Sequence, residues 1–301
     1  MEGAVSYINP WAWYRWARPH PILDKPWRRE GDPEQINEQL AEKLRKDITD
    51  IKFNRGMKKA NVIVLGPAGA GKSSFINSLL SCMKGRLSKK TTTSVSDGDS
   101  FTTKMLKLTA KDLNIRLFDT MGINVKKFIS EEEIKSILEG KLKHGYSFRK
   151  KDTTESEPNT DYTNVEPKEN EKIQVAVIVV AADAMKDIPS DENKMSAIRE
   201  KVKEISEVLK EYDILPIYIL TNVDAICAEV RRSPKMIFQS RAVHEMVKKV
   251  HDTFGPDEND IFPVVNYVKE VDTTTVRDIP LLFALRHIVR LAADHAENDS
   301  I

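Results

Sequence analysis

Residues 66–73 read Gly-Pro-Ala-Gly-Ala-Gly-Lys-Ser, which is the spacing of a phosphate-binding P-loop, G-x-x-x-x-G-K-[ST]. The run before it, 61–65, is almost entirely apolar and rich in β-branched residues, which predicts a buried strand. In the run after it, 74–80, apolar residues recur at helical spacing. A strand, a glycine-rich loop and a helix therefore follow one another in the order that phosphate binding requires.

The chemistry of this loop assigns roles to its residues. The glycines let the backbone wrap closely around phosphate, while loop amides and the helix N-terminus face its oxygens. Lys72 is placed to reach the β- and γ-phosphates, and the Ser73 hydroxyl to bind magnesium. A glycine-rich turn without a ligand is the alternative, which the flanking strand and helix disfavour. The residues predicted to bind nucleotide here are Gly66, Ala68, Gly69, Ala70, Gly71, Lys72, Ser73 and Ser74.

A second motif, Asp119-Thr120-Met121-Gly122, follows a predicted strand over 113–118. A carboxylate at a strand end can hold magnesium through water, and the amide of Gly122 can sense a γ-phosphate. A switch threonine that binds magnesium is expected upstream, with Thr102 as the first candidate and Thr103 as the second. Threonines at a strand edge are the alternative interpretation. The predicted metal ligands are Ser73, Thr102 and Asp119, and the predicted catalytic residues are Lys72 and Thr102.

Base selection is expected where the predicted strand 214–220 ends, in Thr221-Asn222-Val223-Asp224. Guanine-nucleotide proteins hold [NT]-K-x-D at this place, and the aspartate accepts two hydrogen bonds from guanine. Asp224 keeps that acceptor, whereas Asn222 stands where lysine is usual, so stacking on the base should be weaker. After the last predicted strand, Asn266 is placed to offer a backbone amide to the guanine oxygen. The predicted base-site residues are Thr221, Asn222, Asp224 and Asn266.

The whole chain shows the alternation of strand and helix patterns from Ala60 onward that a parallel sheet with crossovers requires. We predict an α/β P-loop NTPase domain over 57–297 with a mostly parallel six-stranded sheet. Residues 149–172 are polar and charged, which predicts a flexible insertion. The predicted strands are 61–65, 104–108, 113–118, 173–182, 214–220 and 261–265, and the predicted helices are 74–80, 131–139, 191–210, 233–254 and 279–293.

Residues 1–56 differ in composition from the rest, and they hold all 4 tryptophans, interleaved with prolines and arginines. A helix is expected from Asp32 as N-cap, with Pro33 in the first turn and Gln35 at the capping-box position. Two interpretations of the tryptophan segment remain open. Residues 8–29 form a docking or self-association surface, or the aromatic side chains pack on the nucleotide domain as a brace. The tryptophans are Trp11, Trp13, Trp16 and Trp27.

The overall composition excludes several classes of protein. The formal net charge is only +1, so binding of nucleic acid is not expected. Cys82 and Cys227 match no metal-ligand spacing and are typical of buried thiols in a reducing compartment. The longest apolar run, 175–182, is far shorter than the ~20 residues that span a bilayer, and no secretory leader precedes the domain. We expect a cytoplasmic protein.

Several motifs together give a family resemblance over residues 27–298. The residues that carry it are Pro26-Trp27-Arg28, 66–77, Ser100-Phe101-Thr102, 119–122, Ile137-Leu138-Glu139-Gly140, 220–224, 264–267 and 278–294. On these residues the segment resembles the interferon-induced protein 44 family of GTP-binding proteins. The resemblance implies a Ras-like G domain, GTP or GDP with Mg²⁺ as ligands, cytoplasmic residence and a role in innate immune or antiviral response. The additional N-terminal domain of many family members would here be reduced to the tryptophan segment.

Catalytic competence is the open question. Ras-type GTPases place a glutamine directly after D-x-x-G to orient the attacking water, and this chain has Ile123 there. Hydrolysis should therefore be slow unless Asn124, or an arginine from a second chain, supplies the missing group. Three functions remain: a slow GTPase switch, a GTP-binding scaffold that hardly hydrolyses, and an ATPase or nucleotide kinase with a divergent base site. The arginines available for a trans role include Arg15, Arg18, Arg28 and Arg29.

Overall fold

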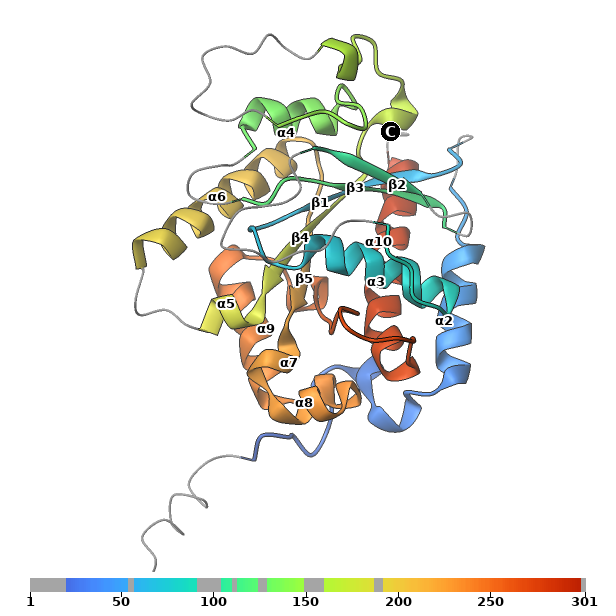
Figure 1. Cartoon of the computed structure of the whole chain (residues 1–301), viewed down its shortest axis with the longest axis vertical. Coiled ribbons are helices and arrows are strands. Elements are labelled where there is room, and N and C mark those ends of the chain that lie inside the picture. Colours follow the sequence, from blue (N-terminus) through green and yellow to red (C-terminus); the bar gives the residue numbers. More distant parts are fainter. Residues whose placement is uncertain are drawn as a thin grey trace, which may run out of the picture.

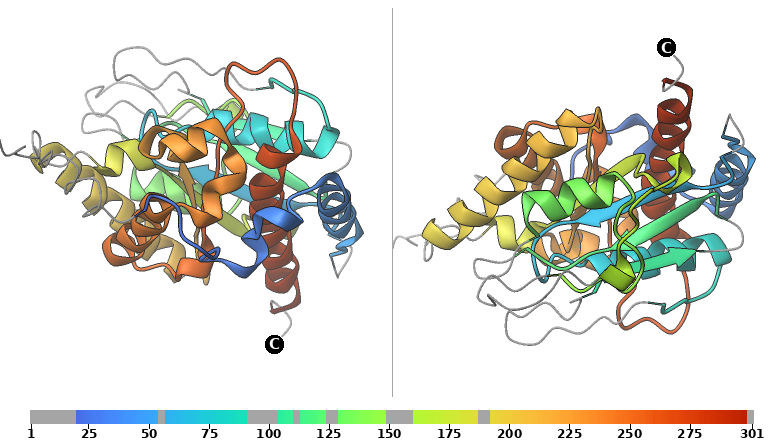
Figure 2. Two further views of the ribbon diagram at one scale, coloured as in Figure 1. Left: turned by 90° about the horizontal axis from the view of Figure 1, so that it is seen from below. Right: turned by 90° about the horizontal axis from the view of Figure 1, so that it is seen from above.

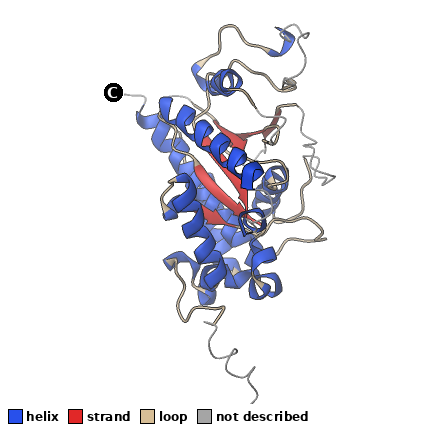
Figure 3. Ribbon diagram, turned by 90° about the vertical axis from the view of Figure 1, so that its left-hand side faces the viewer, coloured by secondary structure: helices blue, strands red, loops and turns tan. Residues whose placement is uncertain are grey.

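The computed structural model describes residues 20–53, 57–90, 104–109, 113–123, 129–148, 160–186 and 192–298. A six-stranded sheet lies between two layers of helices (Figures 1 and 3). Its strand order is β2-β3-β1-β4-β5-β6, and β2 and β3 form the one antiparallel pair. The predicted α/β architecture with a mostly parallel sheet is thus confirmed. The strands are β1 Ala60–Leu65, β2 Leu106–Thr109, β3 Ile115–Asp119, β4 Val175–Ala181, β5 Ile217–Thr221 and β6 Ile261–Pro263.

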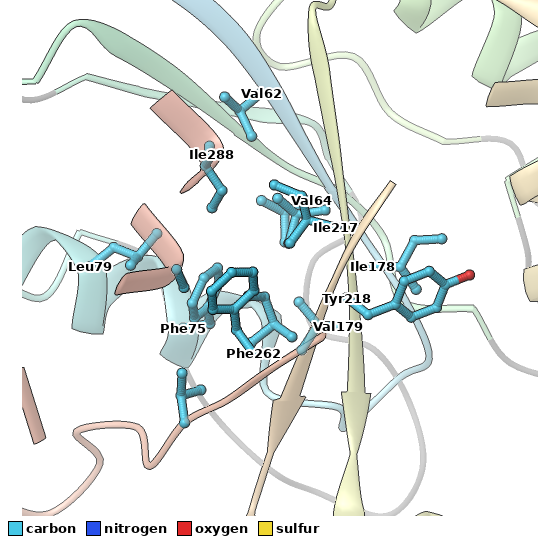
Figure 4. Packing of buried hydrophobic residues seen from close by; sticks show 14 of the residues in the cluster. Val62, Val64, Phe75, Leu79, Ile178, Val179, Ile217, Tyr218, Phe262 and Ile288 are labelled. Carbon is cyan, nitrogen blue, oxygen red and sulfur yellow. The ribbon is translucent and has the colours of Figure 1, made fainter. Parts of the chain in front are cut away.

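The central strands are buried on both faces, as their continuous apolar runs predict. Figure 4 shows Phe75 and Ile288 on the same side of the sheet as Val64, and Tyr218 on the opposite side. Side chains of successive strand residues alternate between the two faces, so each strand contributes to both halves of the core. Because β1, β3, β4 and β5 run in one direction, their carboxyl ends meet at one edge of the sheet.

The helices are divided between the two faces. Helices α2, α3 and α10 pack together on one side, and α4, α6 and α9 on the other (Figure 2). In the described part of the chain, no helix combines the length and apolar character needed to cross a membrane. The helices are α2 Glu38–Asp50, α3 Lys72–Lys84, α4 Glu131–Leu138, α5 Ala182–Lys186, α6 Glu192–Glu211, α7 Val223–Ile226, α8 Ala228–Arg232, α9 Arg241–Phe254 and α10 Thr275–Asn298.

The start of α2 corrects the predicted helix boundary. Asp32 caps only a 3₁₀ turn, Pro33–Gln35, by accepting a hydrogen bond from the Glu34 amide. The α-helix begins after Asn37, whose side chain accepts from the Leu40 amide at 3.0 Å. Both residues are good caps, and the packing of the following apolar face on α10 selects the second. That buried face consists of Ala41, Leu44 and Ile48.

Two further segments differ from the sequence-based expectation. The predicted helix 233–254 is broken at Ser240, whose backbone is extended and whose side chain caps α9 through the Val243 amide. The second half of the predicted insertion, 160–172, contacts the domain. There the side-chain amide of Asn61 in β1 donates to the Lys172 carbonyl at 2.6 Å. Residues 149–159 lie outside the described residues.

The N-terminal tryptophan segment is described only from residue 20 onward. There Trp27 stacks on His244 with ring centroids 5.0 Å apart and contacts Phe238 at 5.5 Å. This part of the segment therefore braces the domain. Trp11, Trp13 and Trp16 lie outside the described residues, so the docking alternative for them stays a prediction. Both cysteines, Cys82 and Cys227, are buried free thiols.

Candidate nucleotide-binding site

The P-loop connects β1 to α3 through three glycines in the left-handed region of backbone space. Their φ angles are 138° at Gly66, 77° at Gly69 and 88° at Gly71. A Cβ on Gly66 would approach the Val179 carbonyl oxygen to 2.2 Å, so no larger residue fits there. The first turn of α3 has no side-chain cap. The positive end of the helix dipole favours an anion at this position.

Lys72 is buried at the first position of α3, with 7% of the residue exposed. Its Nζ donates hydrogen bonds to the carbonyl oxygens of Gly66 and Pro67, both at 3.0 Å. Burial lowers the pKa of Lys72 to about 8, and the charge of Asp119 opposes that shift. The ammonium group is thus held by its own loop, and its charge is only weakly compensated.

Ser73 and Asp119 lie in direct contact. The Ser73 hydroxyl donates to Oδ2 of Asp119 at 2.7 Å, and Oδ1 of this buried carboxylate has no hydrogen-bond partner among the described residues. Burial raises the pKa of Asp119, while the bond from Ser73 and the charge of Lys72 lower it. A hydroxyl beside a buried carboxylate with an unsatisfied oxygen is the donor set that Mg²⁺ prefers. These two residues therefore fit a magnesium ion.

The D-x-x-G segment is hydrogen-bonded to the P-loop. The Ala68 amide donates to the Ile123 carbonyl at 2.8 Å, and the Ile123 amide donates to the Gly66 carbonyl at 3.1 Å. A Cβ on Gly122 would lie 2.6 Å from the Cα of Ala68, so the glycine permits this approach. The Ile123 side chain is buried. Thr102, Thr103 and Asn124 lie outside the described residues.

The base-site residues follow β5 and β6 at the same edge of the sheet. The Thr221 hydroxyl donates to the Ala70 carbonyl at 2.7 Å, and the Asn266 amide group reaches the Gly71 carbonyl at 3.4 Å. The buried Oδ1 of Asn266 has no partner among the described residues. The half-buried Asp224 carboxylate likewise has no hydrogen bond or ion pair within that part of the chain. These acceptors are available to a ligand.

Asn222 does not lie free over a base position. Its backbone is left-handed, with φ 55°, and its amide group donates to Oδ1 of Asp183 at 3.0 Å. Ser74, also predicted to bind nucleotide, lies half-buried in the first turn of α3, and its carbonyl accepts from the Ser78 hydroxyl at 2.7 Å. Hydrogen bonds thus link the P-loop to Asp119, to Ile123 after the D-x-x-G motif, and to Thr221 and Asn266, whereas Thr102 lies outside the described residues.

Sequence reasoning missed two residues beside the P-loop, Asp183 and Arg199. Both line a cavity of about 270 Å³ together with loop residues 67–70 and Asn222. The Nε atom of Arg199 is buried there without a partner among the described residues. Asp183 follows the carboxyl end of β4, which is a usable sequence signal. Arg199 comes from the middle of α6, where no local pattern indicates a site.

Comparisons with known proteins found both curated relatives and solved structures that are similar to this chain. Interferon-induced protein 44 of Mus musculus is 31% identical over 248 residues, covering 80% of this chain and 57% of the relative. Interferon-induced protein 44-like of Homo sapiens is 29% identical over 256 residues, covering 80% and 53%. The chain thus spans about half the length of the curated relatives that it matches. Among solved structures, Toc33 from Arabidopsis thaliana in complex with Mg²⁺ and GMPPNP is 18% identical, has a TM-score of 0.46, and matches 87% of this chain and 95% of that chain.

A family model decides the assignment. The model described as 50S ribosome-binding GTPase matches residues 61–222, which run from β1 through the P-loop and the D-x-x-G motif to the end of β5. This match covers more than half of the chain. The curated relatives confirm the resemblance to interferon-induced protein 44 and its 44-like form. The chain therefore belongs to the 50S ribosome-binding GTPase family and carries a GTP-binding G domain.

Proposed function

We propose that this protein is a magnesium-dependent guanine-nucleotide switch that hydrolyses GTP slowly. The observation that carries the proposal is the pair of hydrogen bonds between Ile123 and the P-loop residues Gly66 and Ala68. These bonds couple the phosphate-binding loop directly to the segment that follows Asp119. A phosphate group bound at the loop therefore changes the surroundings of that segment, which is the physical basis of a switch.

The residues present fit both ligands. Lys72 and the P-loop amides would hold the phosphates, Ser73 and Asp119 the magnesium ion, and Asp224 the guanine. When bound, magnesium would neutralise charge on the phosphate oxygens. The hydrogen bond from the Thr221 hydroxyl to the Ala70 carbonyl holds the base loop, residues 221–224, against the P-loop. The protein thus positions both ends of one nucleotide from a rigid edge of the sheet.

Slow hydrolysis follows from Ile123. Its side chain is apolar and buried, so it cannot orient an attacking water. We infer a turnover of roughly 10⁻⁴ to 10⁻³ per second, as for a slow small GTPase. A GTP-binding scaffold with negligible hydrolysis is the second candidate, and the same buried isoleucine favours it. An ATPase is the third, and the partner-free Asp224 carboxylate argues against it because adenine offers no matching pair of donors.

The names of the relatives suggest the biological setting. We propose a role in the interferon-linked innate immune response, in the cytoplasm, with guanine nucleotide as ligand. Residues 8–29 are proposed to support self-association or to bind a partner protein. A second copy of the chain would then supply an arginine to the phosphate site. Nucleic acid is not proposed as a partner, because the net charge of +1 gives no polyanion-binding field.

The test is GTP turnover by the purified full chain over a wide range of protein concentration. A slow rate that climbs with concentration supports the switch completed by a second copy. Removal of residues 1–19 should then alter the climb while leaving the Trp27 contacts intact. A fast rate that does not depend on concentration overturns slow hydrolysis. A rate near zero throughout supports the scaffold, and competition of GTP against ATP tests the base.

A further inference from the structure

A polar cavity, distinct from the one beside the P-loop, lies near the amino end of β6. Its volume is about 210 Å³, and it is lined by the N-terminal segment, the start of β6 and one face of α10. Helix α10 begins near the base-site residue Asn266, whose carbonyl accepts a hydrogen bond from the Arg277 guanidinium at 3.1 Å. From Arg277 to Arg290, which lines the cavity, the distance along the helix axis is about 20 Å. The cavity is therefore separate from the nucleotide site, and none of its lining residues belongs to the P-loop. Figure 1 shows the course of α10.

One wall is built around Arg28. Its Nη2 donates to the Ile261 carbonyl at 3.0 Å, and its guanidinium lies 5.0 Å from the ring centre of Phe262. Burial lowers the pKa of Arg28, and the carboxylates of Glu30, Asp260 and Glu258 oppose the shift. The Nε and Nη1 groups of Arg28 have no partner among the residues that the structure describes. A fixed cation with unused donors therefore faces this cavity.

The opposite wall carries two more guanidinium groups, one helical turn apart. Arg286 has Asp47 as its ion-pair partner, at a long 3.6 Å. Burial lowers the pKa of Arg286, and the like charge of Arg290 lowers it further. Arg290 is exposed and has no ion pair or hydrogen bond within the described ranges. Like charges at this spacing repel each other, so an anion that contacts both guanidinium groups would relieve the repulsion.

The unpaired donors of the lining point to an anion. Glu30 is the carboxylate in the lining, and Asp47, Asp260 and Glu258 act on Arg286 and Arg28 from outside it, with His287 bonded at 2.8 Å to Asp260. The guanidinium donors that keep no partner in the described part of the chain are Nε and Nη1 of Arg28 and those of Arg290. A phosphate monoester carries about −1.5 to −2 at pH 7 and three acceptor oxygens, which match forked guanidinium donors.

We propose that this cavity binds a phosphate monoester, held by Arg28, Arg286 and Arg290. The site lies apart from the P-loop, and its residues come from the N-terminal segment and α10. The phosphate could be carried by a small molecule or by a phosphorylated side chain of another polypeptide. The chemistry of recognition is the same for both sources, and the experiment separates them.

The test is a calorimetric titration of the GDP-saturated full chain with phenyl phosphate at pH 7.5, with phenyl sulfate and benzoate as comparison anions. We expect saturable binding of phenyl phosphate, at least about fivefold tighter than either monoanion. Arg290→Gln should weaken binding by about tenfold or more, and it should fold normally because Arg290 is exposed and unpaired. The matched control is Arg232→Gln, an exposed arginine on α8, which should bind as the parent does.

Three results would overturn the proposal: no saturation by the parent protein, equal affinity for sulfate and phosphate esters, or equal affinity in the Arg290 and Arg232 variants. The two sources are distinguished by a phosphoserine tripeptide. Binding of the tripeptide at least about tenfold tighter than phenyl phosphate supports a phosphorylated partner chain. Binding no tighter than phenyl phosphate supports a small phosphate ester.

Discussion

The phosphate end and the base end of the nucleotide site differ in how far their polar groups are already engaged. At the phosphate end, Lys72 is bonded to two carbonyls of its own loop, and the Ser73 hydroxyl to Asp119. At the base end, the Asp224 carboxylate and Oδ1 of Asn266 have no partner among the described residues. Phosphate binding therefore has to use the third ammonium donor of Lys72 or replace bonds that the protein already makes, whereas these two base-end acceptors can bind a ligand without losing a protein partner. Affinity is expected to depend on both ends, and pH dependence on the first alone.

Removing the ammonium group at the phosphate end should have the largest effect. Lys72→Ala is expected to weaken GTP binding by about a hundredfold or more, because its buried ammonium group lies within the phosphate-binding loop itself. The fold should be retained, because the substitution removes a buried charge that neighbouring groups compensate only weakly. Fluorescent GTP titration measures the change, and Lys43→Ala on the exposed face of α2 is the control. Parental affinity in Lys72→Ala would refute the P-loop assignment.

Removing the acceptor at the base end should have the next largest effect. Asp224→Asn is expected to weaken GDP binding by about ten- to a hundredfold, because the amide cannot accept two hydrogen bonds from guanine. Xanthine nucleotide should gain affinity instead. Competition of GDP with XDP measures the exchange, and Asp252→Asn on α9 is the charge-matched control. A GDP affinity within twofold of the parent would show that another residue reads the base.

The pH dependence should separate the two ends. Burial lowers the pKa of Lys72 to about 8, and a bound phosphate would keep the lysine protonated to higher pH. Binding therefore takes up a proton above pH 8 and weakens as pH rises. We expect GTP affinity to be about tenfold lower at pH 9 than at pH 7. Titrations at both values measure the slope, which Lys72→Ala should remove. An unchanged affinity at pH 9 would place the charge elsewhere.

Restoring the usual lysine at the base end should have the smallest effect. Asn222→Lys is expected to tighten GDP binding by about two- to fivefold through a stacked cationic stem. Asn222→Ala is the control, because it releases the bond to Asp183 without adding a cation. Equal affinities in the lysine variant and the parent would indicate that Arg199, which lines the same cavity, already covers that face.

The same contrast explains what the sequence could and could not predict. The P-loop, the D-x-x-G motif and the base loop are local patterns that follow strands, so topology alone brings them to one edge. The bonds of Lys72 to its own loop, and of Asn222 to Asp183, arise from three-dimensional proximity and leave no local signal. The start of α2 was mispredicted for the same reason, because packing on α10 chose between two adequate caps.

The docking of α2 on α10 has a consequence for folding during synthesis. Arg45 of α2 donates to the Cys82 carbonyl at 2.8 Å and pairs with Asp278 of α10 at 2.7 Å, across 233 positions of sequence. At ribosomal rates of about 5 to 20 residues per second, the apolar face of α2 waits roughly 10 to 50 s for its partner helix. During that interval Leu44 and Ile48 are exposed on an unfinished chain. Helix α10, which is made long after α2, is thus the element that shields the apolar face of α2 from aggregation.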